Sequence, residues 1–71
     1  MAHGTQTLER GLELFKLVAA HHPAGLRLTD LADLSGLERP TVHRLMACLM
    51  REGLVAQNEA GKRHVLGQYC Q

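Results

Sequence analysis

The residues best suited to bind a metal ion or to react chemically are five histidines and two cysteines, Cys48 and Cys70. His21 and His22 are adjacent, so their side chains diverge in a helix, and the cysteines are too far apart for a zinc knuckle. His3 lies in an unpatterned polar stretch. We therefore expect no metal site, no cofactor and no disulfide framework, and we expect Cys48 to be a partly buried small residue rather than a redox sensor.

Catalysis has no better support than metal binding. The sequence shows no nucleophile elbow, no phosphate-binding loop and no cleft of paired carboxylates. A chain of 71 residues is also too short to enclose a substrate pocket. We expect no catalytic residue, and the protein is not expected to be an enzyme.

Residues 39–52 carry side chains of the kinds that read double-stranded DNA. Arg44 could donate twice to guanine, Thr41 could meet a phosphate or a thymine methyl, and His43 could bond a base edge or a phosphate. Ala47 is small enough to let a helix lie deep in a groove. The residues expected to bind DNA are Arg39, Pro40, Thr41, His43, Arg44, Ala47, Lys62 and Arg63. The alternative is that these charges are only solvated.

The distribution of charge along the chain is more informative about a DNA-binding surface than the net charge, which is only +1. Acidic residues outnumber basic ones up to Gly36, and the balance reverses from Leu37 onward. A DNA-facing surface is therefore expected in the C-terminal half. The length allows one small domain, and the apolar residues are mostly aliphatic, which suits packed helices. No apolar run is long enough to cross a membrane and no secretory signal is visible, so we expect a cytoplasmic protein.

Apolar residues at helical spacing predict a first helix that is capped by Thr7 and ends just before Pro23. Residues 1–6 are expected to form a disordered tail. Leu14 and Leu17 lie on a different side of the helix from its other apolar residues, so we expect them to form a dimer interface. The expected core-facing stripe consists of Leu8, Leu12, Phe15, Val18 and Ala19.

Two further helices are predicted next. Thr29 is expected to cap a brief second helix that ends at residues 35–36, and a third helix is expected over residues 39–52, with proline tolerated in its first turn. The third helix has a single apolar stripe at helical spacing. That stripe consists of Val42, Leu45, Met46 and Leu49.

Three small or apolar residues stand where a helix-turn-helix needs them. Ala32 allows two helix backbones to approach, Gly36 allows the turn a positive φ, and Val42 anchors the second helix on the first. Residues 54–57 and 62–66 predict a hairpin whose turn lies between them. The fold class is therefore mainly α with a small β-hairpin, a winged helix-turn-helix of three helices plus a wing.

Four segments, in order, carry a resemblance to a known family. They are Thr7-Leu8-Glu9-Arg10-Gly11-Leu12-Glu13-Leu14-Phe15, Leu28-Thr29-Asp30-Leu31-Ala32, Arg39-Pro40-Thr41-Val42-His43-Arg44-Leu45 and Leu66-Gly67. Over residues 6–67 the chain looks like the DNA-binding domain of the IclR family of regulators, and T-V-H-R-L is the most specific part. One departure is His64, which stands where the family often carries an aromatic residue.

This resemblance implies a winged helix-turn-helix over residues 7–67, followed by a linker that starts at residues 68–71. It also implies a larger effector-binding domain, a small-molecule effector bound only there, and dimers or tetramers on palindromic operators. Because the sequence stops where the linker should begin, it looks like a fragment. The expected function is sequence-specific DNA binding by a bacterial transcriptional regulator, with helix 39–52 in the major groove and wing 58–63 on the backbone or minor groove. The alternative is a winged-helix protein–protein interaction module that does not bind DNA.

Overall fold

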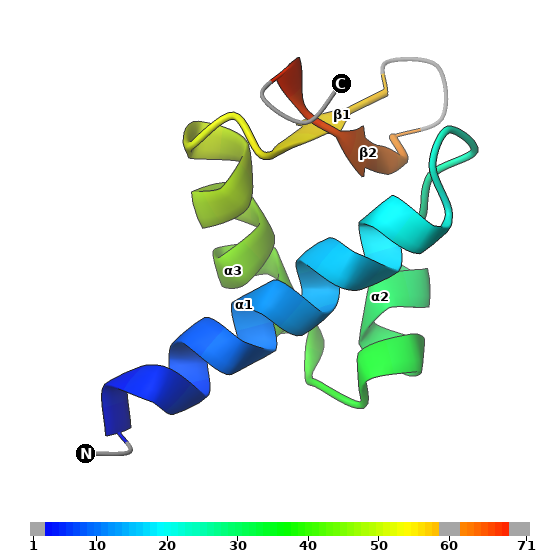
Figure 1. The fold of residues 1–71 in the computed structure, drawn as a ribbon. Coiled ribbons are helices and arrows are strands. Elements are labelled where there is room, and N and C mark those ends of the chain that lie inside the picture. The colour runs from blue at the N-terminus through cyan, green and yellow to red at the C-terminus, as the bar shows by residue number, and fades with distance from the viewer. Residues whose placement is uncertain (1–2, 59–61, 69–71) are drawn as a thin grey trace.

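The computed structural model describes residues 3–58 and 62–68, with side chains from residue 5 onward. Its elements are α1 (His3–Ala20), α2 (Leu28–Ser35), α3 (Arg39–Arg51), β1 (Val55–Gln57) and β2 (His64–Leu66). In Figure 1, α1 crosses α2 and α3, while the two strands lie beyond the C-terminal end of α3. The predicted class, mainly helical with a small hairpin, is confirmed.

Helix α1 begins earlier than the sequence predicted. It starts at His3, so the expected disordered tail is wrong for residues 3–6, and Thr7 lies within the helix instead of capping it. The first residues lack an apolar stripe, yet none of them except Gly4 strongly disfavours a helix. Residues 1 and 2 of the expected tail lie outside the described part of the chain.

The buried face of α1 matches the prediction only in part: Val18 is fully buried and Phe15 packs against the core, as expected. Leu14, expected at a dimer interface, is fully buried, and Leu17 is half-buried and packs against the core. Leu8 and Leu12, expected in the core, are 61% and 46% exposed. In Figure 1 the N-terminal turns of α1 project past α2 and α3. Leu12 precedes Leu14 by two residues, which is about 200° around an α-helix, so it lies on the side of α1 opposite the buried Leu14. Ala19 is also exposed, contrary to the prediction.

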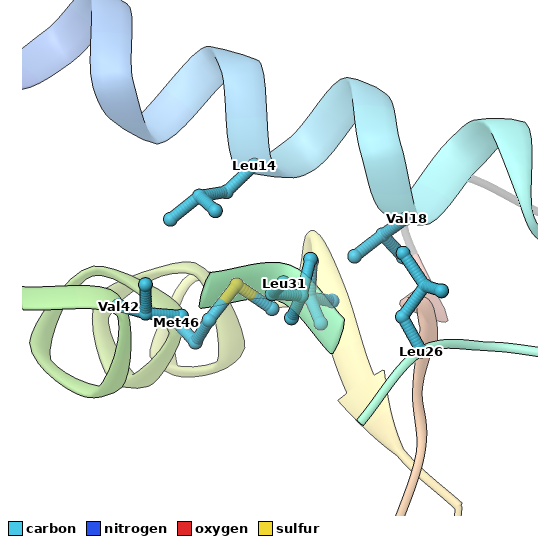
Figure 2. Packing of buried hydrophobic residues seen from close by; sticks show 7 residues of the cluster. Leu14, Val18, Leu26, Leu31, Val42 and Met46 are labelled. Atoms are coloured by element: carbon cyan, nitrogen blue, oxygen red, sulfur yellow. The ribbon is translucent and has the colours of Figure 1, made fainter. Parts of the chain in front are cut away.

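The core forms where α1, α2 and α3 meet. Figure 2 shows Leu14 and Val18 pointing from α1 toward Leu31 of α2 and toward α3, with Leu26 beside Val18. Each such fully buried aliphatic side chain contributes roughly 1.5–3 kcal/mol. The buried apolar residues are Leu14, Val18, Leu26, Leu31, Val42, Met46 and Val55.

Helix α2 is capped by a different residue from the one predicted. The N-cap is Arg27, whose backbone N–H donates to Asp30 Oδ2 at 3.1 Å, and Thr29 is an exposed residue of the first turn. The aspartate at the third helical position thus accepts the backbone N–H of the cap residue, which is half of a capping box. The helix ends at Ser35 with Gly36 as its C-cap, as expected.

The strands β1 and β2 pair antiparallel, with Val55 opposite Leu66 and Gln57 opposite His64. They are shorter than the predicted segments 54–57 and 62–66. A third chain segment adds to this sheet, because Leu26 forms an antiparallel bridge with His64. His64 is buried and its Nδ1 lies 3.2 Å from the Leu26 carbonyl oxygen, so this departure from the family pattern fits the packing of the strand.

Candidate nucleic-acid interface

A tight corner joins α2 to α3. Gly36 has φ 78° and ψ 6°, and its N–H donates to the Ala32 carbonyl at 2.9 Å, which closes α2. Ser35 Oγ then accepts the N–H of Leu37 at 3.2 Å. On the other side of the corner Val42 is fully buried, while Ala32 is half-buried where the two helices pack. The three residues predicted to shape the helix-turn-helix therefore lie together at this corner.

Helix α3 has one buried face and one exposed face. Val42 and Met46 are buried, and Leu45 and Leu49 are half-buried against the core, as the single apolar stripe predicted. Thr41 and Ala47 are half-buried at the border between the faces. The exposed residues of α3 are Arg39, Pro40, His43, Arg44, Cys48 and Arg51.

The exposed face of α3 is cationic. It carries Arg39, Arg44 and Arg51, and no aspartate or glutamate occurs within the helix. Arg51 also lies in the last turn, where a positive charge is favoured by the helix dipole. Such a surface can attract phosphates and present guanidinium donors to base edges.

The two basic residues of the wing differ in their surroundings. Lys62 is exposed, with φ 54°, and its carbonyl accepts a hydrogen bond from Gln57 Nε2 at 3.4 Å. Arg63 is half-buried and its guanidinium donates to the Gly25 carbonyl at 3.2 Å. One of its N–H groups is thus used inside the molecule. Residues 59–61 of the predicted wing lie outside the described residues.

Three residues, Cys48, Gln57 and His22, have surroundings that the sequence did not predict. Cys48 was expected to be partly buried, but it is an exposed free cysteine, and its position four residues after Arg44 was the signal that it shares the outer face. Gln57, which bonds the Lys62 carbonyl, was not singled out. His22, whose Nδ1 accepts the N–H of Leu66 at 3.3 Å, was considered only as a metal ligand.

The described residues also bear on metal binding and on membrane insertion. Among residues 3–58 and 62–68, no three histidine, cysteine, aspartate or glutamate side chains gather closely enough to hold a metal ion. Over the same ranges, no helix has the length and apolar character required to span a membrane.

Comparison with known proteins finds the same architecture in transcriptional regulators. Residues 7–59 match the model of the IclR helix-turn-helix domain. The glycerol operon regulatory protein of Streptomyces coelicolor is 37% identical over 67 residues, which are 94% of this chain and 26% of that protein. The DNA-binding transcriptional repressor YiaJ of Escherichia coli is 42% identical over 52 residues, or 73% of this chain and 18% of that protein.

Solved structures agree with the sequence matches. An IclR transcriptional regulator from Alicyclobacillus acidocaldarius superposes with a TM-score of 0.83 at 26% identity, over 92% of this chain and 26% of that chain. A regulator from Silicibacter superposes with a TM-score of 0.80 at 34% identity, over 90% of this chain and 25% of that chain. The chain thus spans about a quarter of the length of these proteins.

Proposed function

Since the chain belongs to the family of IclR helix-turn-helix domains, we propose that it reads DNA with α3 in the major groove and with the wing on the backbone or in the minor groove. The function is sequence-specific binding of double-stranded DNA within a bacterial transcriptional regulator. The observation that carries the proposal is the exposed cationic face of α3, which directly follows the corner at Gly36. In helix-turn-helix proteins the second helix of the pair enters the groove, and its N-terminal residues contact the bases.

The exposed residues near the start of α3 have distinct proposed roles. Arg44 is exposed and can donate a bidentate pair to guanine O6 and N7, the commonest specific contact in the major groove. His43 is exposed beside it and can bond a base edge or a phosphate. Thr41 and Ala47 border the exposed face, where a hydroxyl and a small methyl group allow close approach. Arg39 and Pro40 complete this surface at the N-terminal end of α3.

The wing contributes contacts that do not depend on sequence. Lys62 is exposed and is the better placed of the two basic residues to neutralise a phosphate. Arg63 donates to the Gly25 carbonyl, so we assign it first to holding the wing, with its remaining N–H groups available to DNA.

The test is Arg44→Ala, measured on a duplex enriched from a random-sequence library by the wild-type chain. Loss of a bidentate contact should cost about 1–3 kcal/mol on that duplex and much less on a mixed-sequence duplex. Arg51→Ala, at the other end of the same exposed face, is the control and should weaken both duplexes alike. Equal losses on both duplexes for Arg44→Ala would make Arg44 a phosphate contact and would contradict its role in base readout.

A titration against salt separates DNA binding from the alternative, a module that binds only proteins. Displacement of counterions predicts that log K falls linearly with log salt, by about 0.9 for each neutralised phosphate. A chain that enriches no duplex from the library, and shows no such slope, would be a protein-binding module.

We further propose that two copies of the domain pair through the exposed side of α1, so that two half-sites are read together. Leu8 and Leu12 are exposed one helical turn apart, and half-buried Phe15 continues their stripe. Sedimentation at rising concentration should show weak dimers that Leu12→Gln abolishes. Leu34→Gln removes another exposed leucine, on α2, and serves as the control. Dimers that survive Leu12→Gln would exclude this face.

The remaining proposals concern the longer proteins that this chain resembles. We propose that the domain works in the cytoplasm beside an effector-binding domain, which alone would bind a small-molecule effector. Dimers or tetramers on palindromic operators would follow from the pairing of two or more copies.

A further inference from the structure

The exposed side of α1 carries a hollow that is bordered by side chains of the helix itself. Its lining includes Glu9, Leu12, Glu13 and Lys16, all of which are exposed. They occupy positions i, i+3, i+4 and i+7, and residues at this spacing surround one hole on a helix surface, which can receive a single side chain from a facing helix. In Figure 1 the N-terminal turns of α1 project past α2 and α3, which gives a second helix access to this hole.

Leu12 also supplies a side chain that suits such a hole. It is aliphatic and 46% exposed, so its burial against another molecule would remove apolar surface from water. The hole is centred between residues 12 and 13, at almost the same height along the helix axis as Leu12 itself. A two-fold axis at that height, perpendicular to α1, would therefore place each Leu12 opposite the hole of the other copy. Two helices that are related by such an axis run antiparallel.

The charges beside Leu12 complement one another in an antiparallel pair. Glu9 precedes Leu12 by three residues and Lys16 follows it by four, so the two lie at nearly equal distances from the centre of the hole. They also lie on the same flank of Leu12, about 60° and 40° from it around the helix. The antiparallel arrangement thus brings Glu9 of one copy beside Lys16 of the second copy, and the symmetry repeats this pair. In a parallel arrangement each residue would face its own equivalent instead.

We propose that a second copy of this chain docks antiparallel on α1, with Leu12 of each copy in the hole of the other and with Glu9 paired with Lys16 on both sides of the two-fold axis. This register rests on the pairing through α1 proposed above, and it adds the direction and the alignment of the two helices. The same two-fold axis relates the two α3 helices, as the half-sites of a palindromic operator require.

Two further charged residues of α1 distinguish this register from others. Glu13 lies next to the centre of the hole, so it approaches Glu13 of the second copy across the axis and is repelled by it. Arg10 lies about 160° from Leu12 around the helix and faces away from the second copy. The register therefore predicts that neutralising Glu13 strengthens the dimer, whereas reversing the charge of Glu9 or Lys16 weakens it.

Charge exchange tests the register directly. Glu9→Lys and Lys16→Glu each convert two attractive pairs into two repulsive ones, so each should raise the Kd of the dimer about tenfold. The double variant Glu9→Lys, Lys16→Glu restores both pairs with opposite polarity and should return the Kd to within about twofold of the wild-type value. Sedimentation equilibrium of the 71-residue chain at low salt, where screening is weak, measures these constants.

Asp33→Lys is the matched control for the change of net charge. Asp33 is exposed on α2, so its reversal should leave the Kd within about twofold of the wild-type value. Glu13→Gln should lower the Kd about twofold, because it removes the approach of like charges. Thermal unfolding below the Kd, followed by circular dichroism, should give every variant a Tm close to that of the wild type, because all the changed side chains are exposed.

The outcomes separate the register from the pairing itself. A double variant as weak as the single variants, or a weaker dimer in Glu13→Gln, would overturn the antiparallel register. If Leu12→Gln abolishes dimers in the same series, the pairing through α1 stands and only the register is lost. If the wild-type chain forms no dimer that Leu12→Gln abolishes, the proposed pairing fails and the register fails with it. DNA binding by α3 is decided separately, by the measurement on Arg44→Ala.

Discussion

At Gly36, between α2 and α3, a Cβ atom would find open space, whereas at Gly67, after β2, it would overlap the backbone of Gly53. The carbonyl carbon of Gly53 would lie 2.7 Å from the new atom and that of Leu54 2.8 Å, with the Gly53 oxygen nearer still. The corner that precedes α3 is therefore determined by backbone conformation, with φ 78°. The chain at Gly67, directly after β2, is determined by close backbone packing instead.

Gly25 combines both constraints. Its φ is 84°, and a Cβ there would lie 2.9 Å from Val65 Cγ1 and 3.0 Å from both Arg63 Cβ and the His64 oxygen. Like Gly67, it lies where the wing meets the rest of the domain. The two glycines at the wing thus allow close packing of backbones, whereas Gly36 in the helix-turn-helix allows a positive φ.

The largest effect is expected for Gly67→Ala. Because the overlapping atoms are backbone atoms, they cannot move aside as a side chain could, and the substitution should lower the free energy of unfolding by about 3 kcal/mol or more. For a domain of this size that corresponds to a fall in Tm of about 12 °C or more. Thermal unfolding followed by circular dichroism measures it. A Tm within a few degrees of wild type would show that the backbones are not in contact.

A smaller loss is expected for Gly36→Ala, because only the left-handed conformation is strained. The expected loss is about 1–2 kcal/mol, with Gly36→Asn closer to wild type and the β-branched Gly36→Val more destabilised. Gly11→Ala is the control, since its Cβ meets nothing within 4 Å inside α1, and it should stabilise the domain slightly. If Gly36→Ala were as stable as Gly11→Ala, conformation would not determine the corner.

The helix-turn-helix could be predicted from the sequence because its signals are local. Helix α3 has one apolar stripe, so its buried face followed directly from the spacing of Val42 and Met46. Helix α1 has apolar residues on several sides, and Leu12 and Leu14 were equally good candidates for the core. The choice between them depends on which side of α1 faces α2 and α3, which helical periodicity does not encode.

The contacts between the wing and the loop that joins α1 to α2 could not be predicted for a different reason. They are made by single polar side chains across large sequence separations, such as Arg63 to Gly25 and His22 to Leu66, which are 38 and 44 residues apart. No spacing rule connects such partners. The wing residues Lys62 and Arg63 therefore looked equivalent in sequence, although the Arg63 side chain donates to the Gly25 carbonyl and the Lys62 residue is exposed.

The bridge between Leu26 and His64 has a consequence for the order of folding. It joins residues 38 positions apart, so α2 and α3 both lie inside the loop that it closes. Closing such a loop costs chain entropy that the hairpin alone cannot offset, because an isolated two-stranded hairpin is marginal in water. The bridge is therefore expected to form only after α2 and α3 have packed on α1. An excised α2–α3 segment would lose this bridge, so the placement of α3 depends on chain segments on both sides of it.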